Sequence, residues 1–107
     1  MAQNREFKIH KTPSKPPFLS INQDLVGEAA GRLKFCGLKL YLYLSSNKDG
    51  YEWSLNSTAY KDWLQTTVGD AAIRKMIREG VEDLLVNKYV RDLGNNKFEF
   101  SDRPFED

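Results

Sequence analysis

The stretch "AAIRKMIREGVEDLLVNKYVRDLGNNKFEF", residues 71–100, decides the fold of this chain. Its first half predicts a helix with one buried face, because apolar residues recur at steps of four, four and three, at Ile73, Ile77, Val81 and Leu84. Its second half alternates apolar and polar residues on either side of "GNN", which predicts a β-hairpin with a tight or three-residue loop. We therefore expect a helix that passes directly into a hairpin.

The charges of this predicted helix are divided along its length. The first half carries the cations Arg74, Lys75 and Arg78, and the second half carries the acids Glu79, Glu82 and Asp83. Early cations and late acids oppose the helix dipole, which is a small disadvantage for a helix that serves the fold alone. The alternative is that cations and acids four residues apart form ion pairs that stabilise an exposed helix without any ligand.

Two more helices and a short strand are expected before this region. A run from about Ala29 to Ser46 repeats apolar residues with the period of a helix, and the turn residues "NKDG" that follow end it. "YEWSL", residues 51–55, alternates as a strand of about three to five residues does. The second helix is predicted from Asn56, its N-cap, to about Leu64.

The two ends of the third helix also carry local signals. Thr67, followed three residues later by Asp70, resembles a capping box in which Asp replaces the usual Glu or Gln. At the other end, Asn87 is predicted to stop the helix in the left-handed conformation.

The composition fits one small domain. The chain has 107 residues, of which 40% are hydrophobic, and its formal net charge is +1. A chain of this size builds a single core, and a charge so close to zero does not by itself indicate a nucleic-acid partner. The two ends differ, since the first is basic and contains prolines and the last is acidic. We expect an N-terminal arm over residues 1–17, a folded domain over 18–101 and an acidic tail over 102–107.

The residues that carry chemistry exclude several classes of function. The only cysteine, Cys36, and the only histidine, His10, are far apart in the sequence and give no recognisable zinc site or Cys–His pair. The sequence also has no glycine-rich phosphate loop. We therefore expect neither an enzyme nor a bound cofactor or metal. A lone cysteine in an apolar run favours a reducing, cytoplasmic setting, and no run approaches the roughly 20 apolar residues that cross a membrane.

Two stretches carry a resemblance to a known family. "GLKLYLYLSSNKDGYEWSLNSTAYKDWL", residues 37–64, joins an aromatic-rich helix to an Asn-Lys-Asp-Gly turn, and "GVEDLLVNKYVRDLGNNKFEF", residues 80–100, joins a helix end to a hairpin. Over about residues 18–101 the chain resembles the winged helix-turn-helix modules of replication-initiation and regulatory proteins from phages and plasmids of Gram-positive bacteria. The resemblance implies an α+β fold of about three helices, with a short strand between the first two and a C-terminal β-hairpin wing.

The chain departs from that family between Trp63 and Gly80, where about one to two additional helical turns are expected. Gly80 lies inside the third helix at a cost of roughly 1 kcal/mol relative to Ala. Either a kink or the close approach of another helix is expected at this glycine.

The resemblance implies that the third helix presents its first half, residues 67–78, to the major groove of double-stranded DNA. Arg74, Lys75 and Arg78 would then face phosphates and guanine edges, while the acids would lie beyond the duplex. Thr66 and Thr67 would donate to phosphates at the start of the helix, although capping explains these two residues equally well.

Two further segments are candidate contacts. The wing tip over 94–97, with Asn95, Asn96 and Lys97, would skim the DNA backbone or minor groove, but the same residues are ordinary hairpin chemistry. The lysines of the arm, Lys8, Lys11 and Lys15, are spread as in arms that enter a minor groove. A solubilising tail is the alternative for the arm.

Two functions follow. The first is a small DNA-binding protein of a mobile element, acting in replication initiation or transcriptional control at an unspecified DNA sequence, with dimerisation or tandem sites supplying specificity. The alternative is a winged-helix module that binds protein, such as a phage-encoded inhibitor or adaptor of a host complex. The near-zero net charge, Asp70 and the acidic tail favour the alternative.

Overall fold

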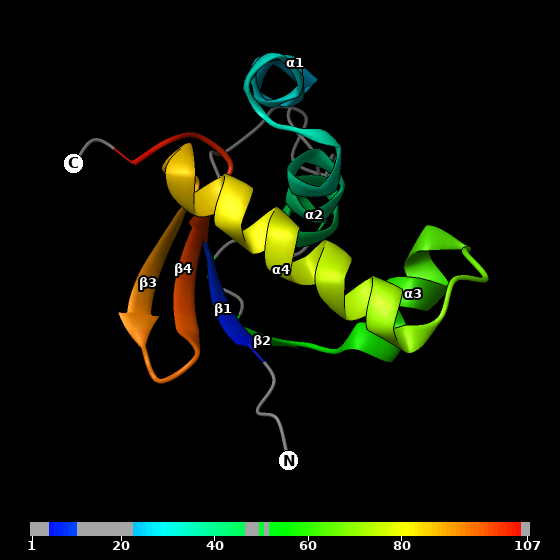
Figure 1. The fold of residues 1–107 in the computed structure, drawn as a ribbon. Helices are drawn as coiled ribbons and strands as arrows, with labels where there is room; N and C mark the ends of the chain where they lie inside the picture. The colour runs from blue at the N-terminus through cyan, green and yellow to red at the C-terminus, as the bar shows by residue number, and fades with distance from the viewer. Residues whose placement is uncertain (1–4, 11–22, 47–49, 51, 106–107) are drawn as a thin grey trace.

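The sheet places a strand from the first described residues beside strands from the last third of the chain (Figure 1). The structure, a computed structural model, describes residues 5–10, 23–46, 50 and 52–105. Its four strands lie in the order β2-β1-β4-β3 and span Glu52–Leu55 (β2), Arg5–His10 (β1), Lys97–Ser101 (β4) and Val90–Gly94 (β3). Strand β1 is parallel to β4 and antiparallel to β2, so the first described residues lie in the interior of the sheet.

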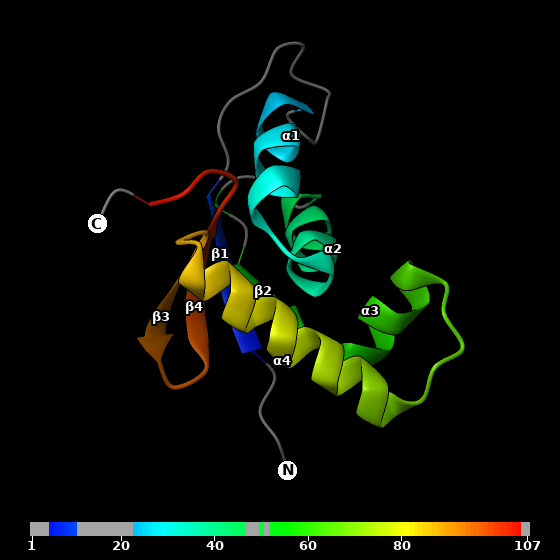
Figure 2. The same cartoon turned by 45° about the horizontal axis from the view of Figure 1, so that its top comes forward.

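Four helices complete a small α+β domain in the described part of the chain: α1 (Gln23–Arg32), α2 (Phe35–Ser45), α3 (Ser57–Leu64) and α4 (Asp70–Val86). Helix α4 crosses one face of the sheet and packs against α2, while α3 lies beside the start of α4 (Figures 1 and 2). The predicted α+β class is confirmed. The described residues nevertheless form one helix and one strand more than predicted.

One face of the sheet is buried because apolar residues alternate with charged ones along its inner strands. Phe7 and Ile9 of β1 lie beside Phe98 and Phe100 of β4, and all four are at most 7% exposed. The rings of Phe7 and Phe98 stack with their centroids 5.2 Å apart. Burying such a side chain contributes about 1.5–3 kcal/mol, so these contacts hold β1 in the sheet.

The predicted N-terminal arm over residues 1–17 is wrong for residues 5–10, which form β1. Three prolines shortly after this segment favoured an extended arm, but "REFKIH" alternates exposed and buried residues as a strand with one buried face does. Lys8 therefore belongs to the sheet. Lys11 and Lys15 lie outside the described residues.

The single helix predicted from about Ala29 to Ser46 is two helices, separated at Leu33 and Lys34. The start of α2 has a tertiary partner, because the backbone N–H of Lys34 donates to the carboxylate of Asp83 in α4 at 2.7 Å. An acid from a distant helix satisfies a donor at the start of α2, and no local pattern indicates such a contact.

Helix α4 runs without interruption through Gly80, where α2 approaches closely. A Cβ atom on Gly80 would lie 2.9 Å from the carbonyl oxygen of Cys36 and 3.3 Å from the side chain of Leu40. Both distances are shorter than ordinary van der Waals contact. Of the two alternatives for this glycine, the close approach of another helix is therefore confirmed.

The hairpin turn has the two-residue form. Asn95 and Asn96 have φ angles of 54° and 61°, and Gly94 before them has a φ of 86°. Positive φ at both central residues gives the turn a twist that matches the twist of the flanking strands, and asparagine adopts this conformation more readily than most residues. The tight turn predicted from "GNN" is confirmed.

The end of α4 differs from prediction in one residue. The C-cap is Asn87, as expected, but its φ is −91°. The left-handed conformation is adopted by the next residue, Lys88, with a φ of 67°. The position of the stop was therefore predicted, and its backbone geometry was not.

The predicted acidic tail over 102–107 is wrong at its beginning. Asp102 is only 3% exposed, and its backbone carbonyl accepts a hydrogen bond from the Tyr41 hydroxyl at 2.6 Å. The ring of Phe105 lies 4.0 Å from the guanidinium of Arg91. The described part of this segment is therefore folded onto the domain.

Candidate nucleic-acid interface

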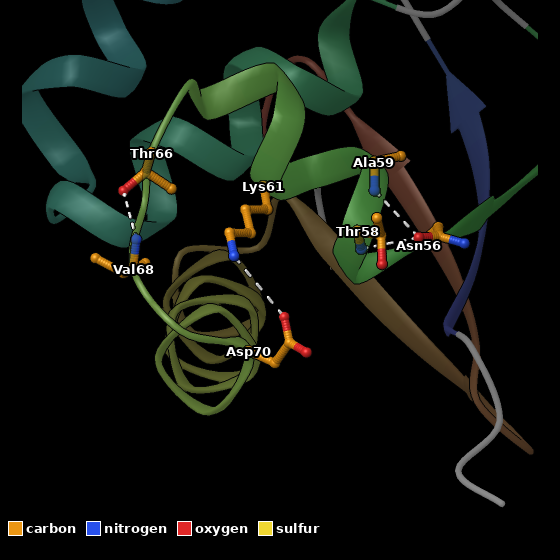
Figure 3. Close-up of polar contacts among 7 residues, drawn as sticks. All are labelled: Asn56, Thr58, Ala59, Lys61, Thr66, Val68 and Asp70. Carbon is orange, nitrogen blue, oxygen red and sulfur yellow. Dashed lines mark hydrogen bonds and ion pairs between the residues drawn. The ribbon is translucent and has the colours of Figure 1, made fainter.

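Helices α3 and α4 are joined by the short connection 65–69, and local signals define where α3 begins and ends. Asn56 caps α3 as predicted, because its side chain accepts from the backbone N–H groups of Thr58 at 2.8 Å and Ala59 at 3.1 Å (Figure 3). Gln65, with a left-handed φ of 55°, terminates α3. The chain thus leaves α3 at a defined point and enters α4 after the connection 65–69.

Thr66 forms a hydrogen bond within this connection, whereas Thr67 is exposed. The hydroxyl of Thr66 accepts from the backbone N–H of Val68 at 3.4 Å (Figure 3). The predicted capping box of Thr67 and Asp70 is wrong, since the N-cap of α4 is Gly69 and no side chain caps the helix there. The first backbone N–H groups of α4 therefore remain suited to an acceptor from outside the helix.

Asp70 lies at the start of α4, where an acid would repel a phosphate. Its Oδ1 atom is 4.0 Å from the Nζ atom of Lys61 in α3, and its side chain is 76% exposed (Figure 3). An acid in the first turn suits the helix dipole, and Lys61 balances its charge. An exposed ion pair of this length adds little stability, but it gives Asp70 an explanation within the fold.

Arg74, Lys75 and Arg78 are all exposed on α4. Glu79 and Glu82, the acids four residues further along, are exposed as well. None of the ion pairs found in the described part of the chain includes any of these three cations. The intrahelical pairs of the alternative interpretation are therefore not formed among the described residues, and the cations are solvated.

The arginines of α4 lie on the flank that faces away from α2. Gly80 contacts α2, and Arg74 and Arg78 lie roughly 120–160° from Gly80 around the helix axis. In both views α2 is on one side of α4, while the hairpin turn and the start of β1 are on the other (Figures 1 and 2). The two arginines are thus turned toward the end of the molecule that carries the hairpin turn.

Asp83 differs from the other acids of α4 because it joins α4 to α2. Its carboxylate accepts from the backbone N–H of Lys34 at 2.7 Å and from the side-chain amide of Asn87 at 3.0 Å. A Cβ atom on Gly37 would overlap this carboxylate, so the glycine in α2 leaves the space that Asp83 occupies. The acidic half of α4 is therefore explained in part by the packing of the helices.

The hairpin turn carries the other predicted contacts. Asn95, Asn96 and Lys97 are exposed, and the backbone N–H of Glu6 donates to the carbonyl oxygen of Asn96 at 2.8 Å. The turn is thereby tied to the start of β1. Whether these three residues touch DNA stays a prediction.

Lys8 lies on the sheet face opposite to the one that α4 covers, and it lines the same open cavity as Lys97 of the hairpin. In the strand register Lys8 is opposite Glu99 of β4 and Glu52 of β2, on the sheet face that points away from the helices. Lys8 therefore belongs to β1 and not to an arm, and its contact with DNA stays a prediction.

The aromatic side chains near α3 are packed into the domain. Tyr41, Tyr43 and Tyr89 are at most 7% exposed. Trp63 is 44% exposed, but its ring centroid lies 4.9 Å from that of Tyr43, which also contacts Tyr60. Burial raises the pKa of the Tyr43 and Tyr60 phenols, so both stay neutral at physiological pH. This cluster fixes α3 on α2.

Among the described residues, no group of three or more His, Cys, Asp or Glu side chains is arranged to hold a metal ion. None of the described helices is both long and apolar enough to cross a membrane. Comparison with protein-family models, with curated proteins and with solved structures finds no match for this chain. The resemblance to winged-helix modules therefore stays a prediction.

Proposed function

We propose that this chain is a winged helix-turn-helix protein of a phage or plasmid that binds double-stranded DNA, in replication initiation or transcriptional control in the cytoplasm. The observation that carries the proposal is the group of exposed cations without ion pairs among the described residues, Arg74, Lys75 and Arg78. The order α2-β2-α3-α4-β3-β4, two helices followed by a hairpin, also supports it. Helix α1 and strand β1 are additions to that order.

A module that docks on a host protein is the second candidate. The face of the sheet that points away from the helices has an open cavity of about 370 Å³, which is lined by Glu6, Phe7, Lys8, Glu52, Ser54, Leu93, Lys97 and Phe98. Its mixed charges and the 55% exposed Leu93 suit a protein surface better than a phosphate backbone. Asp70 and the C-terminal acids support this candidate less than the sequence suggests, because Asp70 lies near Lys61 and Asp102 is buried.

The two candidates respond differently to salt. Fluorescence anisotropy of a labelled random-sequence duplex, titrated with the protein at about 50 and 200 mM salt, measures the response, since each phosphate contact releases counterions. The DNA-binding proposal predicts that affinity falls at least about tenfold between the two salt concentrations. It also predicts that Arg74→Ala/Arg78→Ala binds DNA much more weakly than the wild type at both salt concentrations.

A matched variant separates α4 from general charge effects. Arg32→Ala/Lys34→Ala removes the same number of cations from the exposed junction of α1 and α2, and it should bind DNA almost as the wild type does. Equal losses in the two double variants would mean that α4 is not the interface. No binding by the wild type at low salt would reject the DNA proposal and favour the protein-docking candidate.

A further inference from the structure

Strand β1 places its first residue, Arg5, between the end of β2, which leads into α3, and the hairpin turn. Arg5 pairs in register with Leu55, which directly precedes Asn56, the N-cap of α3. On its other side, the neighbouring Glu6 donates its backbone N–H to Asn96 in the hairpin turn at 2.8 Å. Arg5 therefore lies between the start of α3 and the hairpin turn, which are far apart in the sequence.

The side chain of Arg5 belongs to the helix-covered side of the sheet. Side chains alternate along a strand, so Arg5 shares a face with Phe7 and Ile9, which are 1% and 0% exposed beneath the helices. Arg5 itself is half-buried at the end of that face. None of the ion pairs in the described part of the chain includes it. A half-buried guanidinium of this kind retains donors for an anion.

The cationic half of α4 lies toward the same end of the sheet. The other half of α4 ends shortly before Tyr89 and Val90. Val90 pairs with Phe100 of β4, which lies beside Ile9, near the end of β1 that is opposite to Arg5. In both views the start of α4, beside α3, and the hairpin turn lie on either side of the start of β1, along the lower edge of the domain (Figures 1 and 2). Arg74 and Arg78 face this end from the flank of α4 that points away from α2.

We propose that Arg5 contacts a DNA phosphate between the segments bound by α4 and by the hairpin turn; this inference rests on the proposed DNA-binding function. Guanidinium groups bind phosphate through two parallel hydrogen bonds, and a strand fixed on both sides holds such a group in place. The N-terminal strand is then part of the interface through Arg5, while Lys8 on its opposite face is not.

Arg5→Gln tests the inference, and Lys8→Gln on the opposite face of the same strand is its control. The probe is the labelled random-sequence duplex, titrated across several salt concentrations. Loss of one phosphate contact should weaken binding roughly tenfold at 50 mM salt and lower the slope of log affinity against log salt by about one. Lys8→Gln should leave both values unchanged.

A purely structural role would give a different pattern. Arg5→Lys keeps the charge, so it should retain the wild-type salt slope even where its affinity or melting temperature falls, and a slope as low as that of Arg5→Gln would overturn the inference. Wild-type affinity and slope in Arg5→Gln would also overturn it, while leaving the proposed function intact if Arg74→Ala/Arg78→Ala loses binding. A wild type that binds no DNA would overturn both.

Discussion

The two halves of α4 differ in what they contact. In the first half, Arg74 and Arg78 are exposed and form no ion pair with the described residues. In the second half, Gly80 packs against the backbone of α2 and Asp83 accepts from the N–H of Lys34. One helix therefore combines a surface that is available to a ligand with a surface that the fold needs.

This difference changes the interpretation of the divided charges. Asp83 is acidic because α2 needs an acceptor at its start, and this explanation involves no DNA. The cations have no comparable partner among the described residues. The pattern along α4 thus has two causes, and variants in each half should affect different measurements.

The largest effect is expected from Arg74→Ala/Arg78→Ala. Each arginine is expected to contribute about 1–3 kcal/mol to DNA binding, so the double variant should lose roughly 2–6 kcal/mol of binding free energy. The free energy of unfolding should stay within about 0.5 kcal/mol of wild type, because both side chains are solvated. Anisotropy and urea denaturation measure the two quantities. A large loss of stability would instead make both arginines part of the fold.

Gly80→Ala should lower stability and preserve DNA affinity, which is the opposite of the effects expected for Arg74→Ala/Arg78→Ala. The added methyl group would overlap the Cys36 carbonyl oxygen, so the protein should lose about 1–3 kcal/mol of stability even though alanine favours a helix. DNA affinity should be preserved wherever the variant is folded. Gly27→Ala in α1 is the matched control, because a Cβ atom there has no neighbour within 4 Å. Equal stability of the two variants would contradict the close packing of α2 on α4.

Asp83→Ala should reduce stability by about 0.5–2 kcal/mol, the usual effect of removing a helix cap. Thermal unfolding at neutral pH measures the loss. Glu82→Ala, one residue away and exposed, should change stability by less than about 0.5 kcal/mol. If both variants behaved alike, the contact between Asp83 and Lys34 would not matter for the stability of the domain.

The smallest effect is expected from Glu79→Ala/Glu82→Ala. Intrahelical pairs with the cations are not formed among the described residues, so the free energy of unfolding should change by less than about 0.5 kcal/mol in urea denaturation. DNA binding should become slightly tighter, because two charges that repel phosphates are removed. A clear loss of stability would restore the interpretation that the charges of α4 serve the helix itself.

Local patterns predicted α3, α4 and the hairpin because their signals lie within each element. Asn56 caps α3 through neighbouring backbone groups, and the period of apolar residues in α4 matches its buried face. Asn95 and Asn96 adopt the backbone conformation that a two-residue turn needs. Each of these features is determined by residues a few positions apart.

The features that prediction missed depend on distant residues. Phe7 and Phe98 pair across nearly the whole chain, and Asp83 reaches Lys34 from another helix. The alternation in "REFKIH" was a signal for β1, but the prolines that follow favoured an arm. The candidate contact at Arg5 was missed for the same reason, since it depends on the position of β1 in the sheet.

The salt dependence of DNA binding in Arg74→Ala/Arg78→Ala tests the central claim most directly. If the first half of α4 contacts phosphates, the slope of log affinity against log salt should be shallower than that of the wild type by about one to two, at unchanged melting temperature. An unchanged slope, with wild-type affinity, would contradict the claim that these exposed cations form the interface.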